Sequence, residues 1–341
     1  MIAYGSKCES ILFSILYLIG LISWSESQKK MKRRRRGRPY VYSPIIILRC
    51  FIVRLWFRLD SNNALHQFLE LDYPYNKKIM KRCGLTQIPD RRTFDRRLKT
   101  ISIDIKERIA IMTHLFVCEK MIDPYIVAID STLLKAKGHI WHKSSMNKGI
   151  VPRSGIDTGA RWGFSHTKGW IFGYKLHLIS STGSTIVVPL TADFTTANVQ
   201  DNQLYNPMTA SFSLFTEETY FMIGDSGYDD QKLYDLSINR GFELVCPVQR
   251  YVNTSTKRLH LIEFYESELG QAIYCWRSKS IEPLIEHIKS VFRIDPLPVR
   301  GYQNAAGIVL LSVLLYQILV YYNYKTRRSQ QPKAIKHMLC S

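Results

Sequence analysis

Acidic residues are scarce in this chain: 28 Asp and Glu stand against 47 Lys and Arg, so the net charge is +19 over 341 residues. The seven cysteines are odd in number and scattered, and none forms a Cys-x-x-Cys pair. This usage argues against a disulfide framework or a structural zinc site and favours a reducing compartment. The sequence also lacks an internal repeat, a P-loop, a dinucleotide-binding glycine motif and a nucleophilic triad. It therefore offers no sign of a repeat protein, a nucleotide-binding enzyme or covalent catalysis.

The basic excess points to a polyanionic partner, nucleic acid before a membrane surface. The plainer alternative is a generally basic protein without such a partner. Hydrophobic residues make up 46% of the chain, which is enough for sizeable cores. The length suits one large domain and a small one.

Two apolar stretches resemble membrane segments. Residues 11–24 form a run of only about 14 residues, followed by Lys and Arg and by no small-residue cleavage site. We interpret residues 1–30 as an extension upstream of the functional start at Met31, without an evident partner face. Residues 305–324 are longer, but Ser312, Gln317 and Asn323 interrupt them. We interpret this stretch as a central buried helix rather than a transmembrane span, and we expect no membrane attachment.

Residues 31–115 have the pattern of a basic, helical DNA-binding region. The chain is almost purely basic up to residue 40, and residues 43–59 carry apolar side chains at helical spacing. Three short helical candidates follow, at residues 62–71, 76–83 and 90–100, the last capped by Asp90. Their basic side chains include Arg91, Arg92, Arg96 and Arg97, which suits a helix-turn-helix-like unit. The alternative is the solvated basic face of an ordinary helical domain.

Residues 116–328 alternate between strand-like and helical segments, and residues 329–341 form a basic tail. A strand ends at Asp130, and a loop of about 35 residues rich in Gly, Lys, Arg and His follows it. We predict a hairpin at 170–180 and 184–190, a helix at 201–210, a strand ending at Asp225, a helix at 230–239 and a strand at 242–248. This is the order of a ribonuclease-H-like α/β core, with a mixed five-stranded sheet and flanking helices.

Two aspartates each end an apolar run: Asp130 after Tyr-Ile-Val-Ala-Ile, and Asp225 after Tyr-Phe-Met-Ile-Gly. An acidic group at the end of a buried strand is costly unless a cation meets it. Glu282 opens a basic amphipathic helix downstream. Three carboxylates from separate elements are a usual way to hold two divalent metal ions for phosphodiester chemistry. The alternative is that the aspartates merely start turns.

Five short motifs lie in a consistent order along residues 60–325. They are Ala-Ile-Asp-Ser-Thr (128–132), Gly-Tyr-Lys-Leu-His-Leu (173–178), Thr-Thr-Ala-Asn-Val-Gln-Asp (195–201), Gly-Asp-Ser-Gly-Tyr-Asp (224–229), and Tyr-Cys-Trp-Arg (274–277) with Ile-Glu-Pro-Leu-Ile-Glu-His-Ile-Lys (281–289). In these motifs the chain resembles the DDE transposases of the IS4/IS5 type, found in bacterial and archaeal insertion sequences.

The resemblance implies a catalytic and metal-binding set of Asp130, Asp225 and Glu282. It also implies that Lys289, Arg277 and Tyr274 bind DNA near the element's end. Six residues separate Glu282 from Lys289, as in the family, but four rather than three separate Arg277 from Glu282. Glu286 lies one helical turn after Glu282 and is the alternative third carboxylate.

The activity implied is cleavage at terminal inverted repeats and transfer of the freed 3′ ends into target DNA, supported by two Mg²⁺ ions, with Mn²⁺ as a substitute. The implied partners are double-stranded transposon-end and target DNA, bound by a homodimer. The implied location is cytoplasmic and nucleoid-associated. Two alternatives stay open: a structure-specific nuclease of the same fold, and a non-catalytic DNA-binding protein derived from a transposase.

Overall fold

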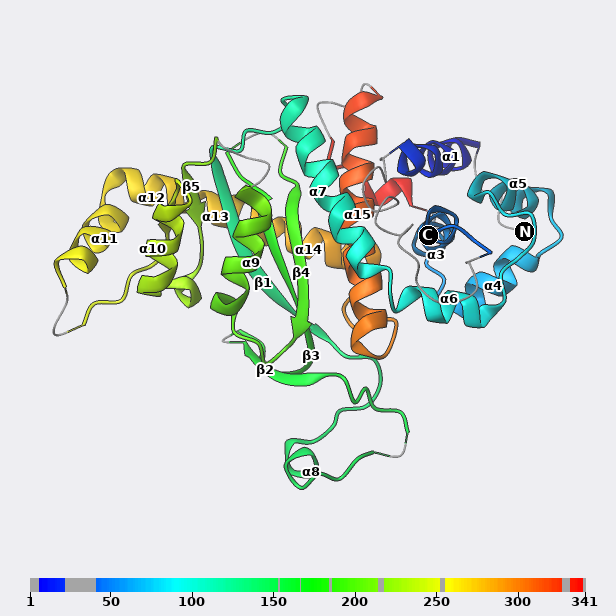
Figure 1. Cartoon of the computed structure of the whole chain (residues 1–341), viewed down its shortest axis with the longest axis horizontal. Coiled ribbons are helices and arrows are strands. Elements are labelled where there is room, and N and C mark those ends of the chain that lie inside the picture. Colours follow the sequence, from blue (N-terminus) through cyan, green and yellow to red (C-terminus); the bar gives the residue numbers. More distant parts are fainter. Residues whose placement is uncertain are drawn as a thin grey trace, which may run out of the picture. The chain divides into compact units, whose positions relative to one another are not determined.

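The chain folds into two compact units, one built from residues 1–104 and 318–341 and the other from residues 105–317. Figure 1 presents them in a computed structural model. The structure describes residues 6–21, 41–152, 154–165, 167–183, 186–213, 218–251, 255–326 and 332–339. The basic tract at 31–40 lies outside these ranges, as do residues 329–331, 340 and 341 of the predicted C-terminal tail.

The first unit is helical. Its helices are α1 (Ser6–Leu21), α3 (Pro44–Trp56), α4 (Asn62–Glu70), α5 (Pro74–Cys83) and α6 (Arg91–Leu98), with a short 3₁₀ turn, η2 (Lys336–Met338). Pro44 opens α3 at a position where no backbone N–H is needed. Gly84 ends α5 in the left-handed conformation, with φ of 85°. The carboxylate of Asp90 accepts the N–H of Arg92 at 2.7 Å, so the predicted cap on α6 is confirmed.

Helix α1 corrects the interpretation of the N-terminal apolar run. Leu12, Ile15 and Ile19 are fully buried, and α1 packs against α3 and α5. The side chain of Arg49 on α3 also donates to the carbonyl of Leu16 at 2.9 Å. The expectation that this segment has no partner face is therefore wrong. Its apolar residues recur every three or four positions, which is the spacing of a helix with one buried face.

The second unit is built on a six-stranded mixed sheet. Its strands are β1 (Ile126–Lys135), β2 (Arg161–Ser165), β3 (Gly169–Ser181), β4 (Pro189–Thr196), β5 (Phe221–Ile223) and β6 (Glu243–Val245). The strand order is β2-β3-β1-β5-β6, and β4 also pairs with β3. The pairs of β3 with β1, β2 and β4 are antiparallel, whereas β5 pairs in parallel with β1 and with β6.

The sheet differs from the sequence prediction in two places. Five strands were predicted, but β2 adds a sixth within the stretch expected to be a loop. The predicted hairpin forms between β3 and β4, yet its second strand runs over Pro189–Thr196 rather than 184–190. Both differences come from short segments whose strand state depends on pairing with the long strand β3 rather than on their own propensity.

The helices of this unit pack on the sheet or lie beyond its strands. They are α7 (Ser102–Cys118), α8 (Lys143–Asn147), α9 (Asp201–Ser213), α10 (Gln231–Asn239), α11 (Thr256–Glu266), α12 (Glu268–Tyr274), α13 (Trp276–Lys279), α14 (Ile281–Phe292) and α15 (Tyr302–Lys325), together with the 3₁₀ turn η1 (Ser226–Tyr228). Helices α7 and α11 to α13 were not predicted. α14 packs against β1 and β3, and α9 packs against β3 and β4.

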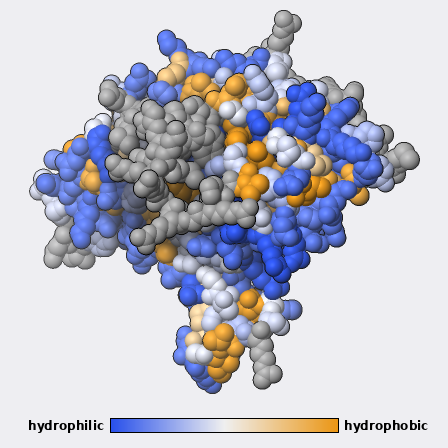
Figure 2. Space-filling model, turned by 45° about the vertical axis from the view of Figure 1, so that its right-hand side comes forward, coloured by the Kyte–Doolittle hydropathy of each residue, from blue (hydrophilic) through white to orange (hydrophobic). Residues whose placement is uncertain are grey.

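Between β1 and β2, residues 136–160 form an arm that extends beyond the strands and carries α8 (Figure 1). Ile140, Ile150 and Val151 on this arm are 50%, 57% and 67% exposed. The lowest part of Figure 2, where this arm lies, shows apolar patches among polar surface. The indole N–H of Trp141 donates to the carbonyl of Ile150 at 3.1 Å, which ties the two sides of the arm together.

Helix α15 is the one helix among the described residues that is long and apolar enough to cross a membrane, and 89% of its apolar window is buried inside the protein. Ser312, Gln317 and Asn323, the polar residues that interrupt it, are fully buried. The side-chain amide of Gln317 donates to the carbonyl of Pro189 at 2.8 Å. These features agree with the interpretation of residues 305–324 as a buried helix, because a buried amide needs a hydrogen-bond partner.

Candidate active site

The parallel pairing of β1 and β5 brings the two aspartates together. Ala128 on β1 lies beside Ile223 on β5, and each chain continues for two residues to Asp130 and Asp225. Neighbouring strands lie about 4.8 Å apart, so the two carboxylates meet at this edge of the sheet. Asp130 does not end its strand as predicted, because β1 continues to Lys135. It lies where β1 loses β5 as a neighbour, which opens one side of its backbone.

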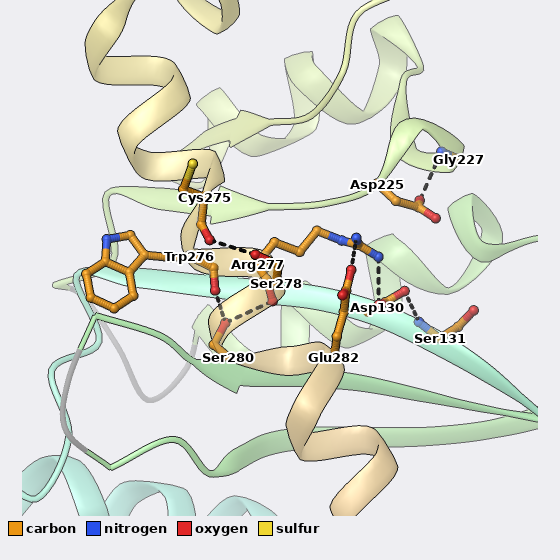
Figure 3. A network of polar contacts seen from close by, with 10 residues as sticks. All are labelled: Asp130, Ser131, Asp225, Gly227, Cys275, Trp276, Arg277, Ser278, Ser280 and Glu282. Carbon is orange, nitrogen blue, oxygen red and sulfur yellow. Dashed lines mark hydrogen bonds and ion pairs between the residues drawn. The ribbon is translucent and has the colours of Figure 1, made fainter.

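Both aspartates are held by backbone N–H groups. Asp130 accepts the N–H of Ser131 at 2.8 Å, and Asp225 accepts the N–H of Gly227 at 2.9 Å. Asp225 thereby caps η1, the turn that follows β5 (Figure 3). Asp225 therefore starts a turn, as one of the two interpretations of the sequence expected. The hydrogen bond from Gly227 also fixes the direction of its carboxylate.

Arg277 joins the third carboxylate to the first. Its guanidinium donates to Asp130 at 2.7 Å and to Glu282 at 2.5 Å (Figure 3). Its side chain is only 17% exposed, whereas the side chain of Glu282 is 46% exposed. One planar fork therefore bridges a buried carboxylate on β1 and a half-exposed one on α14.

The interruption between helices α13 and α14 explains how Arg277 and Glu282 meet although four residues, rather than three, separate them. Ser280 adopts φ of −120° and ψ of −80°, which interrupts the helix. The hydroxyl of Ser280 donates back to the carbonyl of Trp276 at 2.5 Å and does not cap α14. The break turns Arg277 and Glu282 toward each other, so the departure from the family's spacing still brings these two residues into contact.

The electrostatics of the site favour a bound cation. Burial raises the pKa of Asp130 to about 7; the Arg277 guanidinium lowers it and the Asp225 carboxylate raises it further. Burial also raises the pKa of Asp225, against the opposing effects of the Gly227 N–H and of Arg277. The raised pKa values mean that burial disfavours the ionised carboxylates, which a bound cation would stabilise. Clusters of this kind are typical of functional sites.

Lys289 and Tyr274 occupy more enclosed positions than the sequence suggested. Lys289 is 5% exposed, and its ammonium lies 2.9 Å from Glu286 and 3.6 Å from Asp295. It also donates to the hydroxyl of Thr132 on β1 at 3.3 Å. Tyr274 packs edge-on against the ring of Tyr265, with centroids 5.3 Å apart. Lys289 therefore links α14 to strand β1 of the sheet.

A second polar group lies on the opposite face of the sheet, and the sequence analysis gave its members no role. Lys175 on β3 lies 3.0 Å from Asp201 at the start of α9, and His177 lies 3.5 Å from the same carboxylate. His177 also shares a hydrogen bond of 2.8 Å with Thr195. Burial lowers the pKa of His177 to about 4, which Asp201 partly opposes. The signal was present in motifs 173–178 and 195–201, which carried the family resemblance without a stated function.

The four arginines predicted to bind DNA lie on α6, in the other unit. Arg91, Arg92 and Arg96 are exposed. Arg97 is only 8% exposed and donates to the carbonyl of Tyr42 at 3.4 Å, so its side chain turns into the unit.

The acidic set suits a hard cation by its chemistry, because all three of its groups offer carboxylate oxygens. Within the part of the chain that the structure describes, no three His, Cys, Asp or Glu side chains converge closely enough to hold one ion. Arg277 instead occupies the space between Asp130 and Glu282, which establishes that a cationic group fits there.

Several solved structures of transposases have a low similarity to this chain. A piggyBac transposase synaptic complex with hairpin DNA is 9% identical with a TM-score of 0.41, covering 99% of this chain and 79% of that one. The Drosophila P element transposase strand transfer complex is 12% identical with a TM-score of 0.26, covering 92% and 67%. A pre-cleavage Mos1 transpososome is 14% identical with a TM-score of 0.19, covering 98% of both chains. These TM-scores are too low to establish a shared fold.

No curated protein matches the chain. The family of transposase DDE domains, in contrast, matches residues 122–318. That segment covers more than half of the chain and contains Asp130, Asp225, Arg277 and Glu282. The chain therefore belongs to the family of proteins with a transposase DDE domain.

Proposed function

We propose that this protein is the transposase of an insertion sequence of the IS4/IS5 type. It binds the element's terminal inverted repeats, cleaves DNA strands there and transfers the 3′ ends into target DNA. The observation that carries this proposal is the meeting of Asp130 from β1, Glu282 from α14 and the Arg277 fork between them, with Asp225 beside Asp130. If Arg277 served only to stabilise the fold through ion pairs, it would not require Asp225 beside Asp130 on the neighbouring strand.

The strand order supports a ribonuclease-H-like core. Strands β4, β3 and β1 form an antiparallel set, and β1, β5 and β6 continue it in parallel. In this reading β2 is an addition to the five central strands. The consequence is that the first two aspartates lie on neighbouring central strands, where they share one edge of the sheet.

The donor set fits Mg²⁺, and Mn²⁺ as its substitute. Asp130, Asp225 and Glu282 would hold the ions. When bound, two such ions activate the attacking oxygen and stabilise the leaving oxygen of a phosphodiester. No covalent protein intermediate is required.

The chain's own residues position the DNA and the carboxylates. In the complex with DNA, Arg277 can offer its fork to a phosphate once Asp130 and Glu282 are otherwise neutralised, because a planar guanidinium matches two phosphate oxygens. Lys289 keeps α14 against β1 through Thr132 and Asp295, which holds Glu282 at the sheet edge. Tyr274 lies three residues before Arg277, at the end of α12, and would contact DNA beside it.

The helical unit supplies sequence-independent affinity in this proposal. Arg91, Arg92 and Arg96 present exposed charge along one short helix, and the basic tract at 31–40 adds to it. We further propose that two copies act together on paired ends, that the protein works in the cytoplasm at the nucleoid, and that it requires no membrane.

The test is strand cleavage on DNA that carries the element's end. Asp130→Asn and Asp225→Asn should each lower Mg²⁺-dependent cleavage by about a thousandfold or more, the usual scale when a group that stabilises the transition state is lost. Binding to the same DNA should stay within a few fold, because it depends on cations elsewhere. Asp235→Asn is the matched control, since Asp235 is an exposed aspartate on α10.

Full cleavage by Asp130→Asn or by Asp225→Asn would contradict the proposal. Wild-type protein that cleaves but never joins 3′ ends to a target would instead be a nuclease of the same core. Wild-type protein that binds without cleaving would be a non-catalytic derivative.

A further inference from the structure

The turn that carries Asp225 is held at both ends. At its beginning, the Asp225 carboxylate accepts the N–H of Gly227 at 2.9 Å (Figure 3). At its end, four residues after Asp225, the side chain of Asp229 is only 3% exposed. A carboxylate buried to this degree is costly unless charged and hydrogen-bonding groups meet it. The partners of Asp229 therefore define what this residue does.

Asp229 has such partners on three separate segments. The guanidinium of Arg258, near the beginning of α11, donates to its Oδ2 atom at 2.5 Å. The backbone N–H of Gln249, in the segment that follows β6, donates to the same oxygen at 2.9 Å. The hydroxyl of Tyr234 on α10 donates to the Oδ1 atom at 3.1 Å. Three donors on one carboxylate fix its position more tightly than a single ion pair does.

Arg258 is held as firmly as Asp229. Its side chain is 11% exposed, and its Nε atom donates to the carbonyl of Gln249 at 3.0 Å. Its guanidinium carbon also lies 4.8 Å from the centroid of the Tyr251 ring, within the range of a cation–π contact. The planar guanidinium therefore joins α11 to Asp229 and to the segment after β6 at the same time.

A nearby surface ion pair provides a comparison. Arg250 lies 2.6 Å from Glu266, but the two side chains are 69% and 53% exposed. Exposed pairs of this kind contribute little to stability, because water screens them and the side chains lose freedom when they pair. Burial and shared hydrogen-bond partners distinguish the Arg258–Asp229 pair from this surface pair.

The place of Arg258 in the chain relates the pair to the acidic site. Helix α11 packs against α12, and α12 packs against β6 and α13. Arg277 lies on α13, and its fork contacts Asp130 and Glu282. Arg258 thus connects the turn of Asp225 to the helices that lead to Arg277, by a route other than the sheet. Groups that bind metal need support of this kind, because small displacements weaken binding.

We propose that Asp229 and Arg258 are positioning residues of the acidic site: together they keep the turn of Asp225 in place relative to α13 and α14. Asp229 acts through the backbone of this turn, because its N–H also donates to the carbonyl of Ser226 at 3.3 Å. Neither residue contacts the metal or the DNA itself. The proposal rests on the proposed function, because the metal and the reaction come from it.

The first experiment measures metal binding without catalysis. The full-length chain is bound to a duplex with the element's precleaved 3′ end, without target DNA. Mn²⁺ is then titrated, and the free ion is followed by electron paramagnetic resonance against DNA alone. Asp229→Asn and Arg258→Gln should each weaken Mn²⁺ binding by about tenfold or more, the usual scale for groups that orient a metal ligand. Arg258→Lys should fall between Arg258→Gln and wild type, because it keeps the charge but loses the fork.

The second experiment tests whether the two residues act as a unit. The double variant Asp229→Asn/Arg258→Gln should bind Mn²⁺ within about threefold of the weaker single variant, because either change already breaks the contact. Tyr234→Phe removes only a hydroxyl and keeps the ring, so it spares the fold. It should weaken Mn²⁺ binding by about two- to tenfold, the range for one hydrogen bond. The Mg²⁺ concentration for half-maximal joining should rise in the same order in all variants.

Arg250→Gln is the matched control, because it removes an ion pair of the same region at the surface, and it should bind Mn²⁺ as wild type does. A lower melting temperature with unchanged Mn²⁺ affinity in Asp229→Asn and Arg258→Gln would overturn the proposal and leave the proposed function standing. If those variants do not fold, unchanged affinity in Tyr234→Phe would overturn it instead. Failure of the wild type to bind Mn²⁺ and to join 3′ ends would reject the proposed function itself.

Discussion

The arginines of α6 and the single arginine of the acidic site, Arg277, use the same side chain in opposite ways. On α6, Arg91, Arg92 and Arg96 point outward from a short helix. In the other unit, Arg277 is enclosed and makes two charged hydrogen bonds to carboxylates that come from different elements. Exposed charge adds affinity in small, screened increments. Enclosed, paired charge fixes geometry, and its removal leaves its partners unsatisfied.

The comparison extends within α6. Arg97 directly follows Arg96 in the sequence, but one position along the helix turns its side chain by about 100°. It is therefore buried against the carbonyl of Tyr42. A run of arginines in a sequence thus predicts the charge of a helix, while the face that each one occupies depends on the packing around it.

The largest expected effect concerns the carboxylates around Arg277. Glu282→Gln should nearly abolish cleavage and joining, because Glu282 shares Arg277 with Asp130. Glu286→Gln should cost at most about tenfold, or roughly 1.4 kcal/mol in barrier, because Glu286 pairs with Lys289 instead. The measurement is joining of a precleaved 3′ end with Mg²⁺. The reverse ranking would make Glu286 the third catalytic carboxylate.

The next effect belongs to the exposed group. Replacement of Arg91, Arg92 and Arg96 together by Gln should weaken binding to the element's end and flatten its dependence on salt concentration. The slope should fall by up to about 0.9 per lost phosphate contact. The corresponding triple Lys variant keeps the charge and should keep the slope. An unchanged slope in the Gln variant would mean that α6 does not contact DNA.

A smaller effect is expected on stability, where Arg277 can be compared directly with the exposed Arg96. Arg277→Gln should lower the free energy of unfolding by about 1.5–3 kcal/mol, the range for lost hydrogen bonds to charged groups. Arg96→Gln should change it by less than about 0.5 kcal/mol, as is usual for an exposed substitution. Denaturant titrations in metal-free buffer make the comparison. Equal stabilities of the two variants would show that the Arg277 bridge contributes nothing to the fold.

The smallest effect is a pH dependence that involves His177. Burial lowers its pKa from 6.5 to about 4, so between these values the unfolded chain binds a proton that the folded chain does not. Stability attributable to this group is therefore complete above pH 6.5 and declines toward pH 4, by at most about 1.4 kcal/mol per pH unit. His177→Gln should lose this component. The measurement is the thermal melting temperature of wild type and His177→Gln between pH 4 and 6.5. The same pH dependence in both proteins would contradict the role of His177.

Much of the unit at residues 105–317 could be predicted because its pattern is local. Apolar runs that end at Asp130 and Asp225, and the helix that begins near Glu282, are visible as periodicities in the sequence. The structure contains β1, β5 and α14 at these places. The resemblance to transposases rested on the same segments, and the family match covers them.

What could not be predicted depends on partners far away in the sequence. The strand state of β2 depends on pairing with β3. The burial of α1 depends on α3 and α5. The spacing around Arg277 was a doubtful feature of the sequence, but the break at Ser280 makes it compatible with contact to Glu282.

By itself, the sequence determined which chemical groups this protein can use: an excess of cations and three carboxylates in separate segments of the chain. Residue type and local periodicity are properties of the chain alone. Only the tertiary structure decided which of these groups meet. Asp130 and Arg277 are 147 residues apart in the chain yet 2.7 Å apart in space. Such contacts form because burial of the sheet and its helices outweighs the entropy of closing the chain between them.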